Sequence, residues 1–281
     1  GQLVAAELIV TAVIGNVSKF GKHLEAFYDA SASMSKVGQL LDLPLRTQAA
    51  SCDLPEGCHI VANKLSANSH EGKPLFAAVN FDWGLREIIT ISGVAGSGKS
   101  LLLSILAGRA EPDQGGVSVV HTNALVAAAR TSAAFHWLSL ELFPGTIRDN
   151  LLAFDARTST PRRLEKLLVD IGAAPALAQL PDGLDTEVSG VMATLPISLR
   201  VQLAVVMGVA SGARTLLIDG LVDLLAKSDR LKVIAVLRDN GIGAIITTHF
   251  PDEGGAGREG DRHLALRDST LMEVSNHGPS S

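Results

Sequence analysis

Aromatic residues, cysteine and net charge are all scarce in this 281-residue sequence, and each scarcity narrows the classes of protein to consider. Aromatic side chains make up 4% of the chain, so Ala, Val, Leu and Ile must build most of the core. The net charge is −5 and no basic cluster stands out, which argues against nucleic acid as a partner. Hydrophobic residues reach 47% and charged residues only 19%, so the chain is more apolar than most soluble domains.

The two cysteines, Cys52 and Cys58, flank the short segment DLPEG. No set of cysteines and histidines at metal-ligand spacing accompanies them. We therefore expect free thiols in a reducing compartment and no zinc site.

An apolar run, GQLVAAELIVTAVIGNV, occupies residues 1–17, and Glu7 is its only charged residue. It lacks the basic region and the cleavage site of a signal peptide. It is also slightly shorter than the roughly 20 residues that cross a bilayer as a helix. We interpret it as the end of a transmembrane helix. The alternative is an amphipathic helix that packs on a soluble domain, which Glu7 and Gly15 favour.

Composition divides the rest of the chain. The helical pattern continues to residue 43, just ahead of Pro44, so 1–43 is expected to be one long helix. The polar, proline-containing stretch 44–58 predicts a linker, 59–275 predicts a folded domain, and 276–281 predicts a tail.

Within that domain, short apolar runs alternate with helical patterns, which indicates an α/β fold with a mainly parallel central sheet. The region of about 145–212 is nearly all helical and predicts a helical subdomain inserted in the sheet. The expected strands are 59–65, 76–83, 87–93, 116–121, 133–138, 215–220 and 244–249, and the expected helices are 100–108, 162–172, 199–210 and 229–239.

One motif carries most of the chemistry. GVAGSGKS, residues 93–100, fits the pattern G-x-x-x-x-G-K-[ST] between a predicted strand and a predicted helix. Such a loop turns successive backbone N–H groups toward a phosphate chain, beside the positive end of a helix. The lysine can reach the β- and γ-phosphates and the serine hydroxyl can bind Mg²⁺. The expected nucleotide-binding residues are Gly93, Val94, Ala95, Gly96, Ser97, Gly98, Lys99 and Ser100. The alternative is a glycine-rich turn that only connects the strand to the helix.

A second strand, TLLID, ends at Asp219. An enzyme with this phosphate loop needs such an aspartate to hold magnesium, usually through water. The alternative is an aspartate that merely ends the strand or caps the next helix.

The order and spacing of these motifs resemble the ATP-binding domain of ABC transporters, in particular exporters that fuse membrane helices to the ATPase. GKPLFAAVNFDW, LAGRAEPDQGGVSV, LFPGTIRDNLL and LPDGLDTEV resemble segments that the family places around the phosphate loop and before its signature motif. Asp219 lies 24 residues after Leu195, where the signature should begin, and His249 lies 30 residues after Asp219. Both intervals suit the family.

The resemblance implies a P-loop NTPase core with an antiparallel β edge and an N-terminal helix from a membrane domain. It implies ATP and Mg²⁺ as ligands, with Ser100 and Asp219 on the metal and His249 as a catalytic residue at the γ-phosphate. A histidine after an apolar strand is, by itself, more often structural. The implied partners are a second ABC ATP-binding domain and the membrane domain of the same chain. The implied location is the inner (plasma) membrane, with the ATP-binding domain on the cytoplasmic side.

Several positions depart from the family. Gly220 replaces the glutamate that would polarise the attacking water, and losing a general base costs about 10²–10⁴ in rate. Asp223 is the nearest remaining carboxylate. Leu138 stands where a glutamine would sense magnesium, and Ser69 stands where an aromatic side chain would stack on adenine. His70 could serve as a weak stacking platform instead.

The signature motif LSGGQ is replaced by LPISL, residues 195–199. Pro196 has no N–H group, and Ile197 adds a branched side chain where close backbone approach is needed. We expect Ser198 to cap a helix that begins at Leu199.

The sequence therefore predicts an exporter ATP-binding domain with slow or absent hydrolysis. A homodimer would carry both defects twice, so we expect a heterodimer, although a homodimer remains an option. One alternative is a nucleotide-dependent regulatory or scaffold module without a transport role. Another is a different P-loop enzyme such as a small-molecule kinase, but arginines do not cluster as in a kinase lid. Those of the helical region and its border are Arg148, Arg157, Arg162, Arg163 and Arg200.

Overall fold

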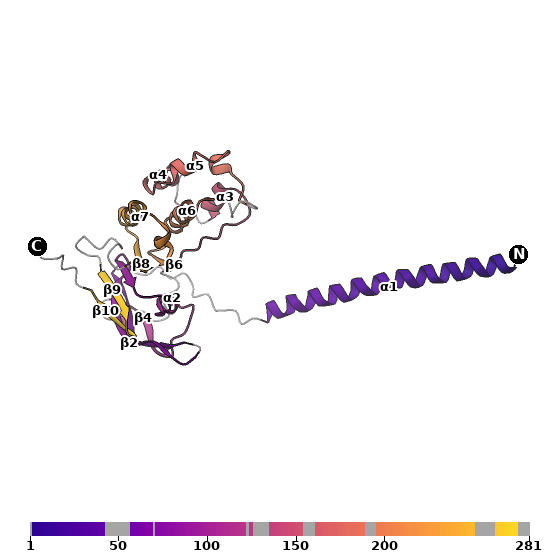
Figure 1. Ribbon diagram of the computed structural model, residues 1–281, viewed down its shortest axis with the longest axis horizontal. Coiled ribbons are helices and arrows are strands. Elements are labelled where there is room, and N and C mark those ends of the chain that lie inside the picture. The colour runs from indigo at the N-terminus through magenta and orange to yellow at the C-terminus, as the bar shows by residue number, and fades with distance from the viewer. Residues whose placement is uncertain are drawn as a thin grey trace, which may run out of the picture. The chain divides into compact units, whose positions relative to one another are not determined.

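The computed structural model describes residues 2–42, 57–69, 71–121, 124–125, 135–153, 161–188, 195–250 and 262–274. The chain divides into two compact units, Gly1–Gln48 and Ala49–Ser281 (Figure 1). Of the predicted linker 44–58, only Gly57 and Cys58 are described, and Cys58 already begins a strand. Cys52, His70 and the predicted tail 276–281 lie outside the described residues.

The described part of the first unit is the helix α1, Gln2–Leu41, which confirms the prediction of a long N-terminal helix. Apolar side chains such as Leu8, Phe20, Phe27 and Leu41 are exposed on it. Within the described residues, no helix combines the length and the apolar character that crossing a membrane requires. The interpretation of residues 1–17 as the end of a transmembrane helix stays a prediction.

The second unit is built on a six-stranded sheet with the order β10-β9-β3-β8-β7-β6. Neighbouring strands from β9 to β6 run parallel, and β10 pairs antiparallel with β9 at one edge. This arrangement confirms the mainly parallel α/β fold with an antiparallel edge. The strands are β3 Ile88–Ser92, β6 Phe135–Trp137, β7 Thr215–Asp219, β8 Gly243–Thr248, β9 Arg262–Arg267 and β10 Thr270–Glu273. All residues of β3 and β8 are buried, as expected for strands with both faces covered.

A second sheet is antiparallel, with the order β2-β1-β4-β5. Its strands are β1 Cys58–Asn68, β2 Pro74–Gly84, β4 Gln114–His121 and β5 Ala124–Leu125. A stack of aromatic rings connects this sheet to β6 of the first. The ring centroids of Phe81 and Trp83 lie 5.1 Å apart, and those of Trp83 and Phe135 lie 5.9 Å apart. Three of the eleven aromatic residues of the chain thus pack where these two sheets meet.

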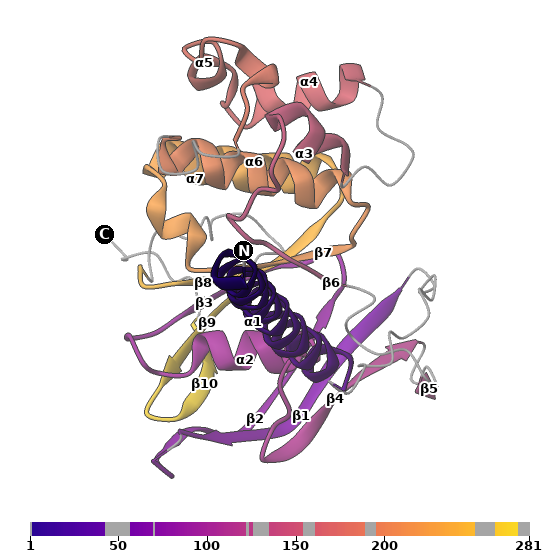
Figure 2. The same cartoon turned by 90° about the vertical axis from the view of Figure 1, so that its right-hand side faces the viewer.

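The helices of the second unit follow the predicted pattern. They are α2 Lys99–Leu106, α3 Ile147–Ala153, α4 Pro161–Asp170, α5 Ala174–Leu177, α6 Ile197–Ala210 and α7 Lys227–Asp239, with short 3₁₀ turns η2 Gly183–Asp185 and η3 Leu221–Leu224. Helices α3 to α6 follow β6 and precede β7, where the sequence predicts a helical subdomain. In both views α4 and α5 lie beyond α6 and α7, away from β1, β2 and β4, and α3 lies beside α6 (Figure 1, Figure 2).

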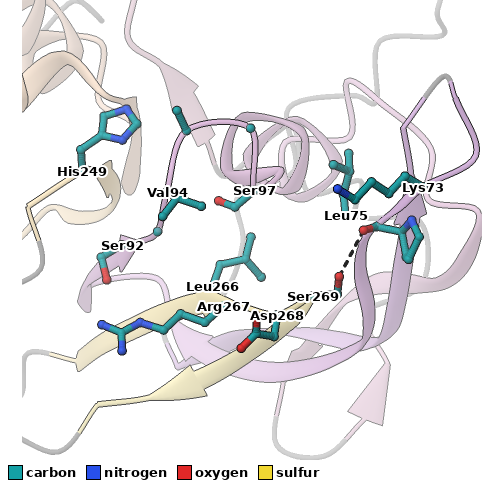
Figure 3. A pocket seen from close by; sticks show the side chains of 14 residues that line it. Lys73, Leu75, Ser92, Val94, Ser97, His249, Leu266, Arg267, Asp268 and Ser269 are labelled. Atoms are coloured by element: carbon teal, nitrogen blue, oxygen red, sulfur yellow. Dashed lines mark hydrogen bonds between the residues drawn. The ribbon is translucent and has the colours of Figure 1, made fainter.

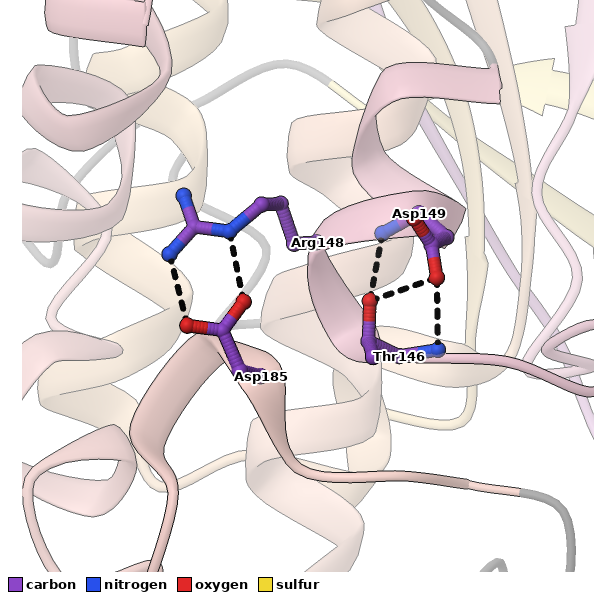
Figure 4. A network of polar contacts seen from close by, with 4 residues as sticks. All are labelled: Thr146, Arg148, Asp149 and Asp185. Carbon is purple, nitrogen blue, oxygen red and sulfur yellow. Dashed lines mark hydrogen bonds and ion pairs between the residues drawn. The ribbon is translucent and has the colours of Figure 1, made fainter.

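Two pairs of polar residues organise the start of α3 (Figure 4). Thr146 and Asp149 cap the helix reciprocally, because the backbone N–H of each residue donates to the other's side chain at 3.0 Å. Arg148 makes a bidentate pair with Asp185 of η2, with N–O distances of 2.7 and 3.1 Å. Both side chains of this pair are exposed, so it adds orientation more than stability.

Candidate functional site

The predicted phosphate loop connects β3 to α2. Gly98 has φ 94°, and a Cβ atom there would lie 3.0 Å from Leu75 Cβ and 3.2 Å from Phe76 Cδ1. A Cβ atom at Gly93 would lie 2.7 Å from the carbonyl oxygen of Leu266 on β9. Gly98 therefore requires glycine both for its left-handed φ and because neighbouring side chains are close. Gly93 requires glycine only because the Leu266 carbonyl is close. The loop is therefore packed closely against β2 and β9 and is held in place by them.

Lys99 opens α2 and folds back over the loop. Its side-chain nitrogen Nζ donates to the carbonyl oxygens of Gly93 and Val94 at 2.8 and 2.9 Å. The residue is 7% exposed, and burial lowers the pKa of its ammonium group, while the negative charges of Asp219 and Asp223 act to raise it. The two acceptors of the ammonium group are thus neutral backbone carbonyls.

Asp219 ends β7, as the sequence predicts. The hydroxyl Oγ1 of Thr247, the register partner of Asp219 on β8, donates to Asp219 Oδ1 at 2.6 Å. The backbone N–H of Gly220 donates in turn to Thr247 Oγ1 at 2.9 Å. Gly220 itself has φ 65°, in the left-handed region that favours glycine.

Asp223 lies in η3 and faces the end of β8. Its carboxylate accepts hydrogen bonds from the hydroxyl of Thr248 and, at 2.8 Å, from the backbone N–H of His249. Both carboxylate oxygens are therefore engaged. The idea that Asp223 replaces the missing general base stays a prediction.

Two cavities flank the phosphate loop. The first has a volume of about 500 Å³ and gathers Lys99, Ser100, Asp219 and His249. Its lining is completed by Leu75, Ala95, Gly96, Gly98, Leu101, Gly220, Thr247 and Thr248. The chain thus brings together, in one cavity, side chains predicted from motifs 30 to 150 residues apart.

The second cavity has a volume of about 790 Å³ (Figure 3). It is lined by Gly93–Ser97 of the phosphate loop, by Lys73–Leu75, by Leu266–Ser269 and by Ser92 and His249. Figure 3 shows Lys73 and His249 at opposite sides of this cavity, with Ser97 between them. All eight residues of the predicted loop line one cavity or the other, and His249 lines both.

The positions that depart from the family lie as follows. Leu138 is buried in the hydrophobic core, and its backbone N–H donates to Leu217 at 2.9 Å. It lines neither of the two cavities. Ser69 lies in the turn between β1 and β2, where its hydroxyl accepts from the backbone N–H of Lys73 at 3.2 Å. The proposed stacking residue His70 lies outside the described residues.

The prediction for residues 195–199 is wrong in one respect. Helix α6 begins at Ile197 rather than at Leu199, with Pro196 at the N-cap position and no capping hydrogen bond from a side chain. Pro196 has φ −52° and ψ 137°, an extended conformation that leads directly into the helix without needing an N–H donor. Ser198 consequently lies inside the first turn, and Leu199 is fully buried.

Sequence reasoning missed the role of the two threonines before His249. Thr247 and Thr248 both line the first cavity, and each donates to a carboxylate of the β7–η3 segment. A signal was present in the sequence, because hydroxyl side chains are unusual at the end of an all-buried parallel strand.

Magnesium fits the residues present. Ser100 and Asp219 supply a hydroxyl and a carboxylate to the same cavity, and such hard oxygen ligands suit Mg²⁺. Among the described residues, no group of three or more His, Cys, Asp or Glu side chains could hold a metal by itself. That is compatible with an ion held by one carboxylate together with water and phosphate oxygens.

Comparison with known proteins agrees with this geometry. A sequence model of the family described as "ABC transporter" matches residues 76–220, just over half of the chain. The chain belongs to the ABC transporter family. Its second unit has the fold of that family's ATP-binding domain and is a nucleotide-binding domain.

Individual relatives are distant. The chain is 26% identical over 234 residues to the leukotoxin export ATP-binding protein LtxB of Aggregatibacter actinomycetemcomitans. The aligned region covers 78% of this chain and 32% of LtxB. It is 25% identical over 224 residues to the ATP-dependent lipid A-core flippase of Xylella fastidiosa. This aligned region covers 78% of the chain and 38% of the flippase. The chain therefore spans about a third of the length of these relatives.

A solved structure supports the fold. The structure of a bacterial Atm1-family ABC exporter with ATP bound matches with a TM-score of 0.70 at 18% sequence identity. The match covers 88% of this chain and 44% of that one.

Proposed function

We propose that this chain is the ATP-binding part of an ABC-type exporter and that it couples the binding of ATP and Mg²⁺ to transport across a membrane. The observation that carries the proposal is the 500 Å³ cavity in which Lys99, Ser100, Asp219 and His249 meet beside the backbone of the phosphate loop. A triphosphate is the ligand whose chemistry uses all of these groups at once.

Each residue has a distinct role in the proposal. The backbone amides of Gly93–Ser100 surround the phosphates at the N-terminus of α2, where the helix dipole favours negative charge. Lys99 exchanges its two carbonyl partners for β- and γ-phosphate oxygens, which are stronger acceptors. Ser100 and Asp219 hold the metal ion, and His249 contacts the γ-phosphate.

The same cavity is poorly equipped to cleave ATP. Gly220 lines it without a side chain, and both oxygens of Asp223 accept hydrogen bonds from Thr248 and His249. Leu138 lies in the core and offers no ligand to the metal. We therefore propose that this site binds ATP and hydrolyses it slowly or not at all.

The proposal also includes partners. ABC ATP-binding domains of this kind are expected to pair, each completing the other's nucleotide site, and residues 195–199 would complete a partner's site poorly. A heterodimer suits these residues better than a homodimer. The membrane domain of the same protein is the second partner, and α1 is the segment that would lead to it. The domain would then lie on the cytoplasmic face of the inner (plasma) membrane.

Binding measured by calorimetry tests the proposal. Wild-type protein should bind ATP in the presence of Mg²⁺, and Lys99→Ala should weaken binding by roughly tenfold to a hundredfold, because a charge-assisted contact contributes about 1.5–3 kcal/mol. Lys166→Ala is the matched control, since Lys166 is an exposed lysine on α4. Equal affinities for wild type and Lys99→Ala would mean that the phosphate loop has been misinterpreted.

A further inference from the structure

The hydroxyl of Thr247 connects the two residues that decide the chemistry of this site. The backbone N–H of Gly220 donates to Thr247 Oγ1 at 2.9 Å, and Thr247 Oγ1 donates to Asp219 Oδ1 at 2.6 Å. Because the oxygen already accepts from Gly220, the single hydroxyl proton is directed at the carboxylate. Thr247 is 1% exposed, so its hydroxyl, at the centre of this chain of hydrogen bonds, has little contact with water.

The backbone at Gly220 is part of the same arrangement. With φ 65° and ψ −2°, Gly220 turns its N–H back toward β8, where it reaches the Thr247 carbonyl oxygen at 3.2 Å as well as the hydroxyl. A residue with a Cβ atom adopts this conformation only at a cost. The glycine, the hydroxyl and the carboxylate therefore form one unit across the ends of β7 and β8.

We infer that Thr247 is a positioning residue that holds the Asp219 carboxylate in the orientation needed by the metal ion of the bound nucleotide. This inference rests on the proposed function, because it takes Asp219 as a metal partner. The Thr247 hydroxyl occupies Oδ1, and Oδ2 accepts no hydrogen bond within the described part of the chain. One oxygen is anchored to β8, and the other is left for the cavity that Asp219 lines.

The physical reason is preorganisation. A carboxylate that is free to rotate pays an entropic cost when it must adopt one rotamer to bind a metal ion. A charge-assisted hydrogen bond from a buried hydroxyl fixes that rotamer in advance and stabilises the ionised form. Loss of the hydroxyl should therefore weaken the contribution of Mg²⁺ to nucleotide binding, and leave contacts between the loop and the phosphates intact.

The experiment measures ATP affinity with Mg²⁺ and again with EDTA, so that the gain due to the metal ion is obtained for each variant. We expect Thr247→Val to reduce the gain in ATP affinity due to Mg²⁺ about tenfold, which is the size of effect expected when a hydrogen bond to a charged group is lost. The ATP affinity measured in EDTA should change little. Thr247→Ser, which keeps the hydroxyl, should retain the gain. If Thr247→Val does not fold, Thr247→Ala removes the same hydroxyl with less bulk.

Thr215→Val is the matched control. Thr215 is a fully buried residue at the opposite end of β7, and its hydroxyl donates to Leu85 at 2.6 Å. This variant should lower stability and leave the gain due to Mg²⁺ unchanged. It separates the loss of any buried hydroxyl from the loss of the one that touches Asp219.

The outcomes distinguish the inference from the function on which it rests. A wild-type protein that binds ATP equally well in Mg²⁺ and in EDTA would overturn the proposed metal role of Asp219, and the inference with it. A wild-type gain that Thr247→Val retains would overturn the inference alone. Equal losses in Mg²⁺ and EDTA would also overturn it, because they would show a purely structural role for Thr247.

Discussion

By the resemblance to the family, Gly220 stands where a general base is expected, and its backbone conformation limits which residues could replace it. The residue has φ 65°, and its N–H is tied to Thr247 of β8. The space around a Cβ atom there is open, so any obstacle to a larger residue comes from the backbone. Restoring a carboxylate thus requires either a strained backbone or a new path for the chain between β7 and η3.

We predict that Gly220→Glu does not restore ATP hydrolysis. The substitution should cost about 1–2 kcal/mol of unfolding free energy because a non-glycine residue must adopt the left-handed conformation. The rate of phosphate release should increase by far less than the roughly 10²-fold that a working general base would give. Urea unfolding and a phosphate-release assay measure the two effects.

Gly241→Glu is the control for strain alone, since Gly241 also has φ 65° and lies in the turn before β8. It should show a similar loss of stability with no change in ATP binding. A gain of a hundredfold or more in phosphate release by Gly220→Glu would contradict the prediction.

At the same scale, the sequence identified some residues of the site and missed others. Lys99, Ser100 and Asp219 were predictable because each has a fixed place in a local motif next to a strand or helix end. Thr247 was not, because its importance comes from a partner 28 residues away on a neighbouring strand. The threonines at the end of the strand are visible in the sequence, but the register of two parallel strands, which pairs Thr247 with Asp219, is a tertiary property that no local pattern encodes.

Helix α6 begins within residues 195–199, the segment predicted to replace the family signature. By that resemblance Leu199 stands where the family has glutamine, and its side chain is fully buried in the core cluster with Leu203 and Leu216. Ile197, two residues earlier, is 42% exposed. The start of the helix thus contributes Leu199 to the core and exposes Ile197.

We predict that Leu199→Gln destabilises the domain by about 3–5 kcal/mol. Replacing a buried leucine removes its hydrophobic contribution and leaves an amide without partners. Ile197→Gln makes a similar chemical change on the exposed side of the same helix end, and should cost less than about 1 kcal/mol. Urea unfolding of both variants tests the difference. Equal losses would show that Leu199 is not packed as described.

The elements themselves were mostly predictable. The runs 87–93, 215–220 and 244–249 became β3, β7 and β8 because continuous apolar segments beside turn residues identify buried strands. Strands β9 and β10 were missed, since charged residues interrupt RHLALRDSTLMEV and the hairpin gains its stability by pairing with β3. The start of α6 was misplaced because Ser198 was assigned as the capping residue, whereas Pro196 occupies the N-cap position.

At the scale of the whole molecule, the domain is expected to need a partner. Two copies of this chain would each supply Gly220 and residues 195–199, so neither nucleotide site of a homodimer would be competent. The isolated chain should therefore release phosphate slowly at any protein concentration.

We predict that phosphate release by the purified chain stays close to that of Lys99→Ala, which serves as the baseline without proper ATP binding. The measurement is a phosphate-release assay over a range of protein concentrations that would reveal dimerisation. Fast release that increases with concentration and disappears in Lys99→Ala would contradict the prediction and favour an active homodimer.

Local order along the chain was enough to reveal a mainly parallel α/β domain with a phosphate loop, because strand, glycine-rich turn and helix follow one another within a few residues. It also led to the prediction that several groups of an ATPase are missing. Only the tertiary structure decided that Gly220 is left-handed, that Asp219 is held by Thr247, and that Asp223 is engaged at the end of β8. These features depend on how β7 and β8 lie side by side, and pairing across a sheet joins residues that the sequence keeps apart.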